Sequence, residues 1–253
     1  KSVNKVSYAF SCKKTGDASD KNLVNRAENK QSKLIRKKSV DTVIVEEPLQ
    51  ITLSWLEHGK VINKVFTITM RTPGHDYFLI IGLLHSEGII KQLNHIESIK
   101  MAIKDTDGEG IDNEWIVTFT SGFIPDLSSL DRYTVSYSSC GLCGATSLKS
   151  LQLKTEINLS FPEHKNIIEA ESLLLLSNKM RDKQSLFDNT GGVHGVALFD
   201  QDLNLQQVHE DIGRHNAVDK IIGSLLVSDK LLKVAPLWIL LVSGRISFEI
   251  VQK

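Results

Sequence analysis

The stretch His194-Gly-Val-Ala-Leu-Phe199 decides the fold, because it begins a pattern of strand, turn, strand and helix. Polar residues 200–204 predict a turn, Leu205 to Val208 a return strand, and Asn216 to Val227 a helix with one apolar face. The apolar run Leu237 to Val242 predicts a strand that is buried on both faces. Because strands alternate with helices, this half of the chain is expected to be a layered α/β domain with a parallel or mixed sheet.

The first half of the chain predicts a strand-rich module with one helix over residues 41–135. Alternating apolar residues in Ile51 to Leu56 and in Val65 to Met70 flank a short turn, which is typical of a hairpin. Apolar residues at helical spacing predict a helix from His75 to His85. Two further strands are expected at Thr42–Val45 and Trp115–Thr120.

The two ends of the chain differ from these parts. Residues 1–40 are polar and rich in Lys and Arg, which is typical of a solvated, disordered tail; a flexible arm for an acidic partner or RNA is the alternative. The α/β domain is expected to cover residues 136–253 and to begin with a cysteine-containing loop. It is expected to be cut off at Lys253, part-way through a helix that starts at Ile246.

Composition excludes several classes of protein. The 253 residues carry 30 basic and 30 acidic side chains, so we expect no general attraction to nucleic acid or to a membrane surface. No apolar run approaches the roughly 20 residues that span a bilayer. Three cysteines, an odd number, argue against a secreted disulfide framework. We therefore expect a cytoplasmic protein whose thiols are reduced.

Two of the three cysteines form the motif Cys140-Gly-Leu-Cys143, set among Ser and Gly residues. Small polar neighbours predict an accessible loop in which the two thiols contact each other and a partner protein. Because the thiolate is the nucleophilic form of cysteine, this pair is a candidate for accepting and passing on a sulfur atom. A redox dithiol fits less well, since a βαβ pattern is expected beside such a motif and a strand-rich module precedes this one.

Zinc binding is the third interpretation of the cysteine pair. Zinc deaminases combine a His-x-Glu segment with a later Pro-Cys-x-x-Cys, and this chain has His85-Ser-Glu87 and His95-Ile-Glu97 upstream. No proline precedes Cys140, and no second Cys-x-x-Cys supplies the remaining ligands of a structural site. We therefore expect no metal site.

A second group of candidate residues lies near the ends of the strands expected in the second half. Ligands of open α/β sheets bind outside the carboxyl ends of the strands. Arginines there suit phosphate groups, and helix N-termini add backbone amides. The candidate contacts to such a ligand are His194, Asp211, Arg214, His215, Ser243 and Arg245. The structural alternative is that Asp211 caps a helix and that Arg214 pairs with Asp219.

In the first half of the chain, the matching polar segment is Arg71-Thr-Pro-Gly-His-Asp76. Arg71 and His75 are candidates for a functional role where the two parts of the chain meet. The structural alternative is that Thr72 or Asp76 caps the predicted helix, with Pro73 near its first turn.

Taken together, these motifs resemble the FdhD family, the formate dehydrogenase accessory sulfurtransferases. The resemblance covers most of residues 41–253 and leaves the N-terminal tail outside. Six segments carry it in order: Arg71–Asp76, Gly82–Ile90, Ser139–Gly144, Thr190–His194, Glu210–Lys220 and Ser243–Glu249.

The resemblance implies a sulfur relay. A cysteine desulfurase would pass sulfur to the cysteine pair as a persulfide, with Cys140 carrying it and Cys143 assisting. The protein would then deliver this sulfur to a bound molybdenum bis(pterin guanine dinucleotide) cofactor, its client, which enters formate dehydrogenase. The family further implies a homodimer and a cytidine-deaminase-like fold without the deaminase zinc site. Two other functions stay open: a cofactor-binding chaperone whose cysteines do not turn over, and a zinc-dependent deaminase-like hydrolase.

Overall fold

The computed structural model describes residues 2–11, 33–102, 113–127, 168–229 and 238–253. They belong to two compact units, Lys1–Val43 and Ile44–Lys253.

The first unit contains two antiparallel strands, β1 (Ser2–Ser11) and β2 (Lys33–Thr42). The sequence predicted a disordered tail over residues 1–40, and the structure differs by placing these strands there. Antiparallel pairing satisfies backbone groups without needing an apolar run, so composition does not reveal it. The strand expected at Thr42–Val45 is wrong, because β2 ends at Thr42 and residues 43–46 lie outside any strand.

The second unit begins with a four-stranded sheet in the order β4-β3-β6-β5. Its strands are β3 (Glu47–Glu57), β4 (Lys60–Arg71), β5 (Ile96–Met101) and β6 (Glu114–Phe119). β3 pairs antiparallel with β4 and parallel with β6, so the sheet is mixed. The predicted hairpin and the strand at Trp115–Thr120 are confirmed, whereas the sequence did not predict β5.

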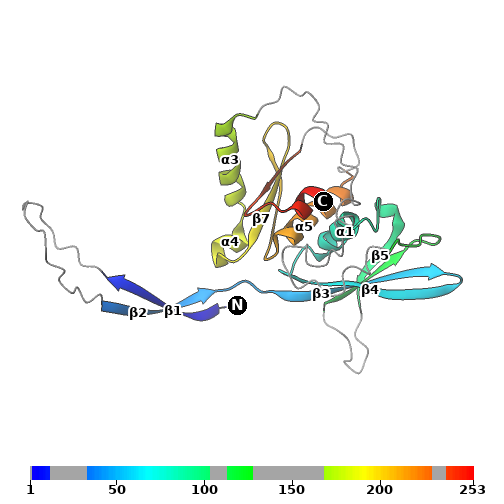
Figure 1. Ribbon diagram of the computed structural model, residues 1–253, viewed down its shortest axis with the longest axis horizontal. Helices are drawn as coiled ribbons and strands as arrows, with labels where there is room; N and C mark the ends of the chain where they lie inside the picture. Colours follow the sequence, from blue (N-terminus) through cyan, green and yellow to red (C-terminus); the bar gives the residue numbers. More distant parts are fainter. Residues whose placement is uncertain (1, 12–32, 103–112, 128–167, 230–237) are drawn as a thin grey trace, which may run out of the picture. The chain divides into compact units, whose positions relative to one another are not determined.

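One face of this sheet packs against helix α1 (Asp76–Ser86), which confirms the predicted helix. Leu49, Ile51 and Leu53 alternate along β3 and are fully buried, because residues two apart in a strand share a face. They belong to one core with the buried residues of α1, among them Leu79. Figure 1 shows α1 beside the sheet.

A separate three-stranded sheet has the order β8-β7-β9, with β7 (His194–Phe199), β8 (Leu205–Asp211) and β9 (Ile239–Val242). The α/β class is confirmed. Between the described strands of this half every pairing is antiparallel, which differs from the parallel or mixed sheet expected here, and the mixed sheet lies in the first half. Only residues 200–204 connect β7 to β8, and parallel strands need a longer crossover. The cytidine-deaminase-like arrangement stays a prediction.

Among the described strands, the apolar strand β9 lies at the edge of its sheet, and its residues are only partly buried, so the expected burial on both faces is wrong. Leu240 is 37 % exposed. An apolar run indicates that a strand packs on a core, but it does not distinguish a central strand from an edge strand.

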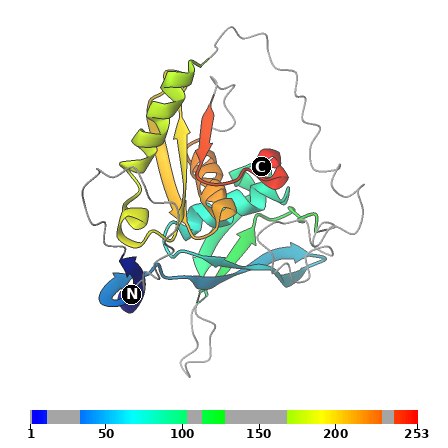
Figure 2. The same ribbon diagram turned by 60° about the vertical axis from the view of Figure 1, so that its left-hand side comes forward.

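Helices cover both faces of the three-stranded sheet, as Figure 2 shows. Helix α3 (Ala170–Arg181) packs Leu176 and Met180 against one face, and α5 (Arg214–Val227) packs against the other. Helix α5 confirms the helix predicted at Asn216–Val227. No helix in the described part of the chain is long and apolar enough to cross a membrane.

Helices α1 and α5 cross at very close range through two glycines. A Cβ atom added at Gly82 would lie 1.9 Å from the carbonyl oxygen of Asp219. A Cβ atom added at Gly223 would lie 1.9 Å from the carbonyl oxygen of Phe78. Each helix also packs on its own sheet, so this crossing joins the two sheets of the second unit.

Candidate functional site

The cysteine pair cannot be placed in the site, because Cys140 and Cys143 lie outside the described residues. The structure does place the other candidates. Some of them gather where β7 begins and α5 starts, and others form a buried network between β8 and the segment that follows β4.

His194 begins β7 and lies against the turn that follows β9. The Oγ atom of Ser243 accepts the Gly195 N–H at 2.8 Å, and the Ser243 N–H donates to the Gly195 carbonyl at 2.8 Å. Gly244 has a φ of 92°, and a Cβ atom added there would lie 3.4 Å from two atoms of the His194 ring. Glycine therefore permits both the positive φ and the close approach of this turn to the imidazole. Arg245 follows in the turn and is exposed.

The start of α5 brings two more candidates to this corner. The Nε2 atom of His215 lies 2.9 Å from the Oγ atom of Ser247, which immediately precedes helix α6 (Phe248–Gln252). The Nε atom of Arg214 is buried and has no hydrogen-bond partner among the described residues. The first amides of a helix favour an anion, so a guanidinium at the same place adds to an anion-binding arrangement.

Several ionisable groups surround the ring of His215 at this corner. Burial lowers the pKa of His215, Lys253, Arg214 and His194 lower it further, and Glu249 acts in the opposite direction. A cationic neighbour disfavours the charged form of a histidine, which is why Lys253 and Arg214 act in the same sense. The Arg214 guanidinium and the amides at the start of α5 suit an anionic ligand. We name these residues the strand-end cluster, defined as His194, Arg214, His215, Ser243 and Ser247.

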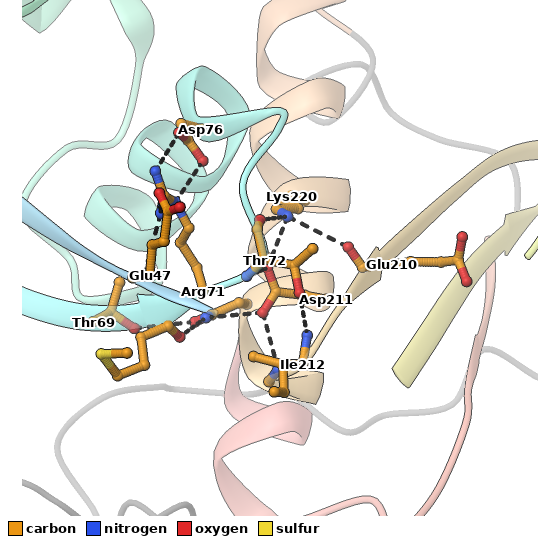
Figure 3. Close-up of polar contacts among 12 residues, drawn as sticks. Glu47, Thr69, Arg71, Thr72, Asp76, Glu210, Asp211, Ile212 and Lys220 are labelled. Atoms are coloured by element: carbon orange, nitrogen blue, oxygen red, sulfur yellow. Dashed lines mark hydrogen bonds and ion pairs between the residues drawn. The ribbon is translucent and has the colours of Figure 1, made fainter. Parts of the chain in front are cut away.

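Asp211 belongs to a different, fully buried group, drawn in Figure 3. Its carboxylate lies 2.7 Å from the Nζ atom of Lys220, and the two side chains are 0 % and 1 % exposed. Oδ2 also accepts the Thr72 N–H at 3.2 Å, while Oδ1 accepts the Gly213 N–H at 2.9 Å and the Asn216 side-chain amide at 3.2 Å. Because both oxygens are occupied, Asp211 presents nothing to a ligand, and its role at the start of α5 is structural.

Thr72 is held through all of its polar groups. Its N–H donates to Asp211, its carbonyl accepts Lys220 Nζ at 3.1 Å, and its Oγ1 accepts the Ile212 N–H at 3.0 Å. The same Lys220 Nζ donates to the carbonyl of Glu210 at 3.3 Å. We name Thr72, Asp211 and Lys220 the buried ion-pair group. It fixes the segment that follows β4 against the end of β8 (Figure 3).

Arg71 is also saturated by protein groups. It is 2 % exposed and forms a fork with Asp76, through Nε at 3.1 Å and Nη2 at 3.0 Å. Nη1 donates to the Glu47 carbonyl at 3.2 Å, and Nη2 also donates to the Asn113 side chain at 3.2 Å. A guanidinium engaged in this way holds the chain together and is not free to bind a phosphate.

His75 is exposed and is the N-cap residue of α1, with φ 58° and ψ 28° in the left-handed region. Its side chain makes no capping hydrogen bond to the described part of the chain. The predicted capping by Thr72 or Asp76 is wrong, because Thr72 bonds to β8 and Asp76 to Arg71. A left-handed histidine costs backbone energy, and the buried contacts on both sides of it hold it there.

The His75 ring belongs to an aromatic group rather than to the strand-end cluster. It stacks on Phe78 with centroids 5.9 Å apart and meets His209 edge-on at 4.8 Å. Burial, and then the charges of His75 and Lys220, lower the pKa of His209 to about 4. Its buried Nδ1 atom has no hydrogen-bond partner in the described ranges. His209 is therefore neutral at pH 7.

The predicted alternative pairing of Arg214 with Asp219 is wrong. Asp219 is fully buried, accepts a hydrogen bond from Ser86 Oγ at 2.8 Å and pairs with Lys253. Burial raises the pKa of this carboxyl. Among the described residues, no group of three or more His, Cys, Asp or Glu side chains could hold a metal ion.

Two residues that matter for this corner, Lys220 and Ser247, were not among the candidate site residues that the sequence predicted. Lys220 lies between Val218 and Ile221 in the apolar stretch of α5, and a lysine at such a position needs a buried partner. That signal was in the sequence, although it does not identify Asp211 as the partner. Nothing in the pattern around Ser247 predicts its contact with His215.

Comparison with known proteins shows that this chain is similar in sequence to one protein family. A sequence model of the FdhD/NarQ family matches residues 44–253. A protein named sulfur carrier protein FdhD from Streptomyces avermitilis is 40% identical over 218 residues, which cover 84% of this chain and 72% of that protein. A protein of the same name from Saccharolobus solfataricus is 37% identical over 223 residues, covering 85% of this chain and 74% of that protein.

The chain is also similar to a solved structure. It matches the crystal structure of a proposed formate dehydrogenase accessory protein from Desulfotalea psychrophila with a TM-score of 0.57. The match covers 99% of this chain and 78% of that chain at 20% sequence identity. At this identity the likeness supports the fold alone.

Proposed function

Because this chain belongs to the FdhD/NarQ family, we propose that it is a sulfurtransferase that carries sulfur from a cysteine desulfurase to the molybdenum cofactor of formate dehydrogenase. The observation that carries this proposal is the extensive identity with proteins that are named sulfur carriers. The Cys140-Gly-Leu-Cys143 motif supplies the thiols that such a function needs.

The two cysteines pass the sulfur on in two thiol exchange steps. A Cys140 thiolate attacks the outer sulfur of a persulfide on the desulfurase, the desulfurase thiolate leaves, and Cys140 becomes the persulfide. A Cys143 thiolate then attacks the inner sulfur, which releases the outer atom as sulfide to the client and leaves a Cys140–Cys143 disulfide. The released sulfur gains two electrons and the two cysteines lose them. A thiol reductant restores both thiolates for the next cycle.

The strand-end cluster is the proposed site for the phosphate groups of the client, a molybdenum bis(pterin guanine dinucleotide). Its support is the buried Nε of Arg214, which has no partner among the described residues, the position of Arg214 beside His215, and the N-terminus of α5. Arg245 is exposed beside it and extends the cationic surface. His75 lies outside the strand-end cluster and is proposed as a further contact to the cofactor. Arg71 and Asp211 act by holding the protein together, not by touching the client.

The partners follow from the same proposal. A cysteine desulfurase supplies the sulfur, formate dehydrogenase receives the sulfurated cofactor, and the protein acts as a homodimer in the cytoplasm. Neither nucleic acid nor a membrane is needed for this cycle.

Mass spectrometry tests the relay directly. Reduced protein is incubated with an active cysteine desulfurase and cysteine, and intact and peptide masses are recorded before and after adding a reductant. The proposal expects one or more added sulfur atoms on the peptide that holds Cys140 and Cys143, removed by the reductant. Fragmentation of that peptide is expected to place the first sulfur on Cys140. The variants Cys140→Ala and Cys143→Ala serve as controls, and Cys12→Ala is expected to load normally.

Failure to gain sulfur while the desulfurase is active would contradict the relay. That result would favour the alternative function, a cofactor-binding chaperone. Such a chaperone would support formate dehydrogenase equally well with both cysteines replaced.

A further inference from the structure

Two neighbouring carboxylates at the end of β8 hold two different segments of the chain. Glu210 and Asp211 are consecutive strand residues, so their side chains leave on opposite faces of the sheet. Asp211 faces α5 and holds Thr72 in the buried ion-pair group. Glu210 faces the other way, and the proposed function assigns no role to its carboxylate.

The Glu210 carboxylate holds the start of helix α4 (Ser185–Thr190). Oε2 accepts the Leu186 N–H at 2.9 Å, and Oε1 accepts the Phe187 N–H at 2.8 Å. The N-cap residue Gln184 makes no side-chain capping bond to the described part of the chain, so Glu210 supplies the cap from another element. Two charge-assisted bonds to adjacent amides fix both the position and the direction of the helix.

Helix α4 leads directly into the strand-end cluster. It ends at Gly191, whose φ of 65° turns the chain toward His194 at the start of β7. The Gln184 side chain is 3 % exposed and lies so close to Gly195 that an added Cβ there would be 2.3 Å from Nε2. The beginning of the short segment before His194 is therefore held on β8 through Glu210 and lies against β7 through Gln184.

We propose that Glu210 is a positioning residue for the strand-end cluster, because it holds the segment that places His194 while Asp211 beside it holds the start of α5. It touches no ligand itself. The inference rests on the proposed function, since the ligand whose binding it governs is the guanine dinucleotide cofactor. The Nζ atom of Lys220 contacts both residues, through the side-chain carboxylate of Asp211 and the backbone carbonyl of Glu210.

The test compares Glu210→Gln with the matched control Asp200→Asn. A glutamine oxygen accepts one amide, but its NH2 group faces the other amide and repels it. Asp200 also accepts backbone amides, those of Asp202 at 3.0 Å and Asn204 at 2.9 Å, and it holds the turn at the opposite end of the β7–β8 hairpin. Both variants lose a carboxylate that fixes backbone, but only one adjoins the strand-end cluster.

GDP, the nucleotide end of the cofactor, is titrated into the full chain by calorimetry at a temperature where unfolding curves show each variant to be folded. We expect Glu210→Gln to bind GDP roughly tenfold more weakly than the unchanged protein, and Asp200→Asn to bind it equally well. Glu210→Asp keeps the charge but is one methylene shorter, so its GDP affinity is expected to lie between those of Glu210→Gln and the unchanged protein. If Glu210→Gln does not fold, the GDP affinity of Glu210→Asp is compared with that of Asp200→Asn instead.

Three results would overturn the inference. Equal GDP affinity in Glu210→Gln and the unchanged protein would mean that Glu210 is only a helix cap. Equal weakening in Asp200→Asn would mean that any loss of backbone support has the same effect. Absence of GDP binding by the unchanged protein would overturn the proposed cofactor site, and this inference with it, whereas sulfur loading of the cysteines would still test the relay separately.

Discussion

The buried ion-pair group and the strand-end cluster lie close together along β8 and α5. They differ in whether their buried charged side chains have partners. In the first, Lys220 and Asp211 are withdrawn from water and every polar group of Thr72 has a partner (Figure 3). In the second, a buried Arg214 nitrogen has no partner among the described residues. A buried ion pair whose partners satisfy each other becomes strongly destabilising only when one partner is removed. A guanidinium nitrogen without a hydrogen-bond partner in the described residues, beside a helix N-terminus, is an arrangement that an anionic ligand completes.

The largest expected effect is the loss of the buried carboxylate. Asp211→Ala leaves the Lys220 charge buried without a counter-ion, so the free energy of unfolding is expected to fall by about 3–5 kcal/mol. Urea unfolding at pH 7 measures it. Replacing both partners, Asp211→Leu with Lys220→Met, is expected to cost much less, because no charge is stranded. A loss below about 1 kcal/mol in the single variant would remove the distinction between the two groups.

The next largest expected effect is the loss of stability when the pH falls and His209 becomes protonated. The pKa of His209 is about 4 in the folded state and about 6.5 when unfolded, so the unfolded chain binds more protons between these values. Its contribution to stability is complete above pH 6.5 and is lost as the pH falls toward 4, by about 2–3 kcal/mol. Unfolding at pH 7 and at pH 4.5 is compared with His209→Phe, which keeps a ring but does not titrate. The same loss in both proteins would assign the effect to other groups.

The close crossing of α1 and α5 at Gly82 and Gly223 is the next test. Gly82→Ala is expected to destabilise the protein by about 1–3 kcal/mol, because the new methyl group meets backbone and forces the helices apart. Alanine favours a helix over glycine, so the packing cost is larger than the measured difference. At the control position Gly192 an added Cβ makes only ordinary contact, at 3.6 Å. Thermal unfolding of both variants decides whether the crossing is as tight as described.

The smallest change in stability is expected in the strand-end cluster. Arg214→Gln removes a cation whose Nε has no partner in the described residues, so stability is expected to stay within about 0.5 kcal/mol. Its affinity for GDP is expected to fall roughly tenfold, as for the loss of a charge-assisted hydrogen bond. Unfolding and GDP titration are measured on the same preparation. A stability loss like that of Asp211→Ala would place Arg214 among the structural residues.

The sequence predicted those elements whose own residues carry a repeating pattern. The β3–β4 hairpin, α1, β7 and α5 have clear periodicity and were found close to their observed bounds. Sheet topology depends instead on connections and partners, so the antiparallel pairing of β7 with β9 and the edge position of β9 were not predicted. The strands β1 and β2 lack an apolar pattern and were missed for that reason.

The candidate site was predicted as a set of residues, but their division into two roles was not. The sequence grouped His194, Arg214, His215 and Ser243 as ligand contacts, and the structure places them near one another, while their contact with a ligand stays a prediction. It could not show that Asp211 is taken by Lys220 and Thr72, because Thr72 is 139 residues away in the chain. Whether a charged side chain is paired depends on these distant contacts. A single sequence identifies the polar residues, but only the structure shows which residues they pair with.

Tracing radioactive sulfur is the most direct test of the proposed function. Cysteine labelled in its sulfur is supplied to a desulfurase, this protein, the cofactor and a formate dehydrogenase that lacks sulfurated cofactor. The account predicts label on Cys140 or Cys143 first, then in the cofactor of the dehydrogenase, with activity gained in step and abolished by Cys140→Ala. Activation of the dehydrogenase by the Cys140→Ala and Cys143→Ala variants, with no label passing through this protein, would contradict it.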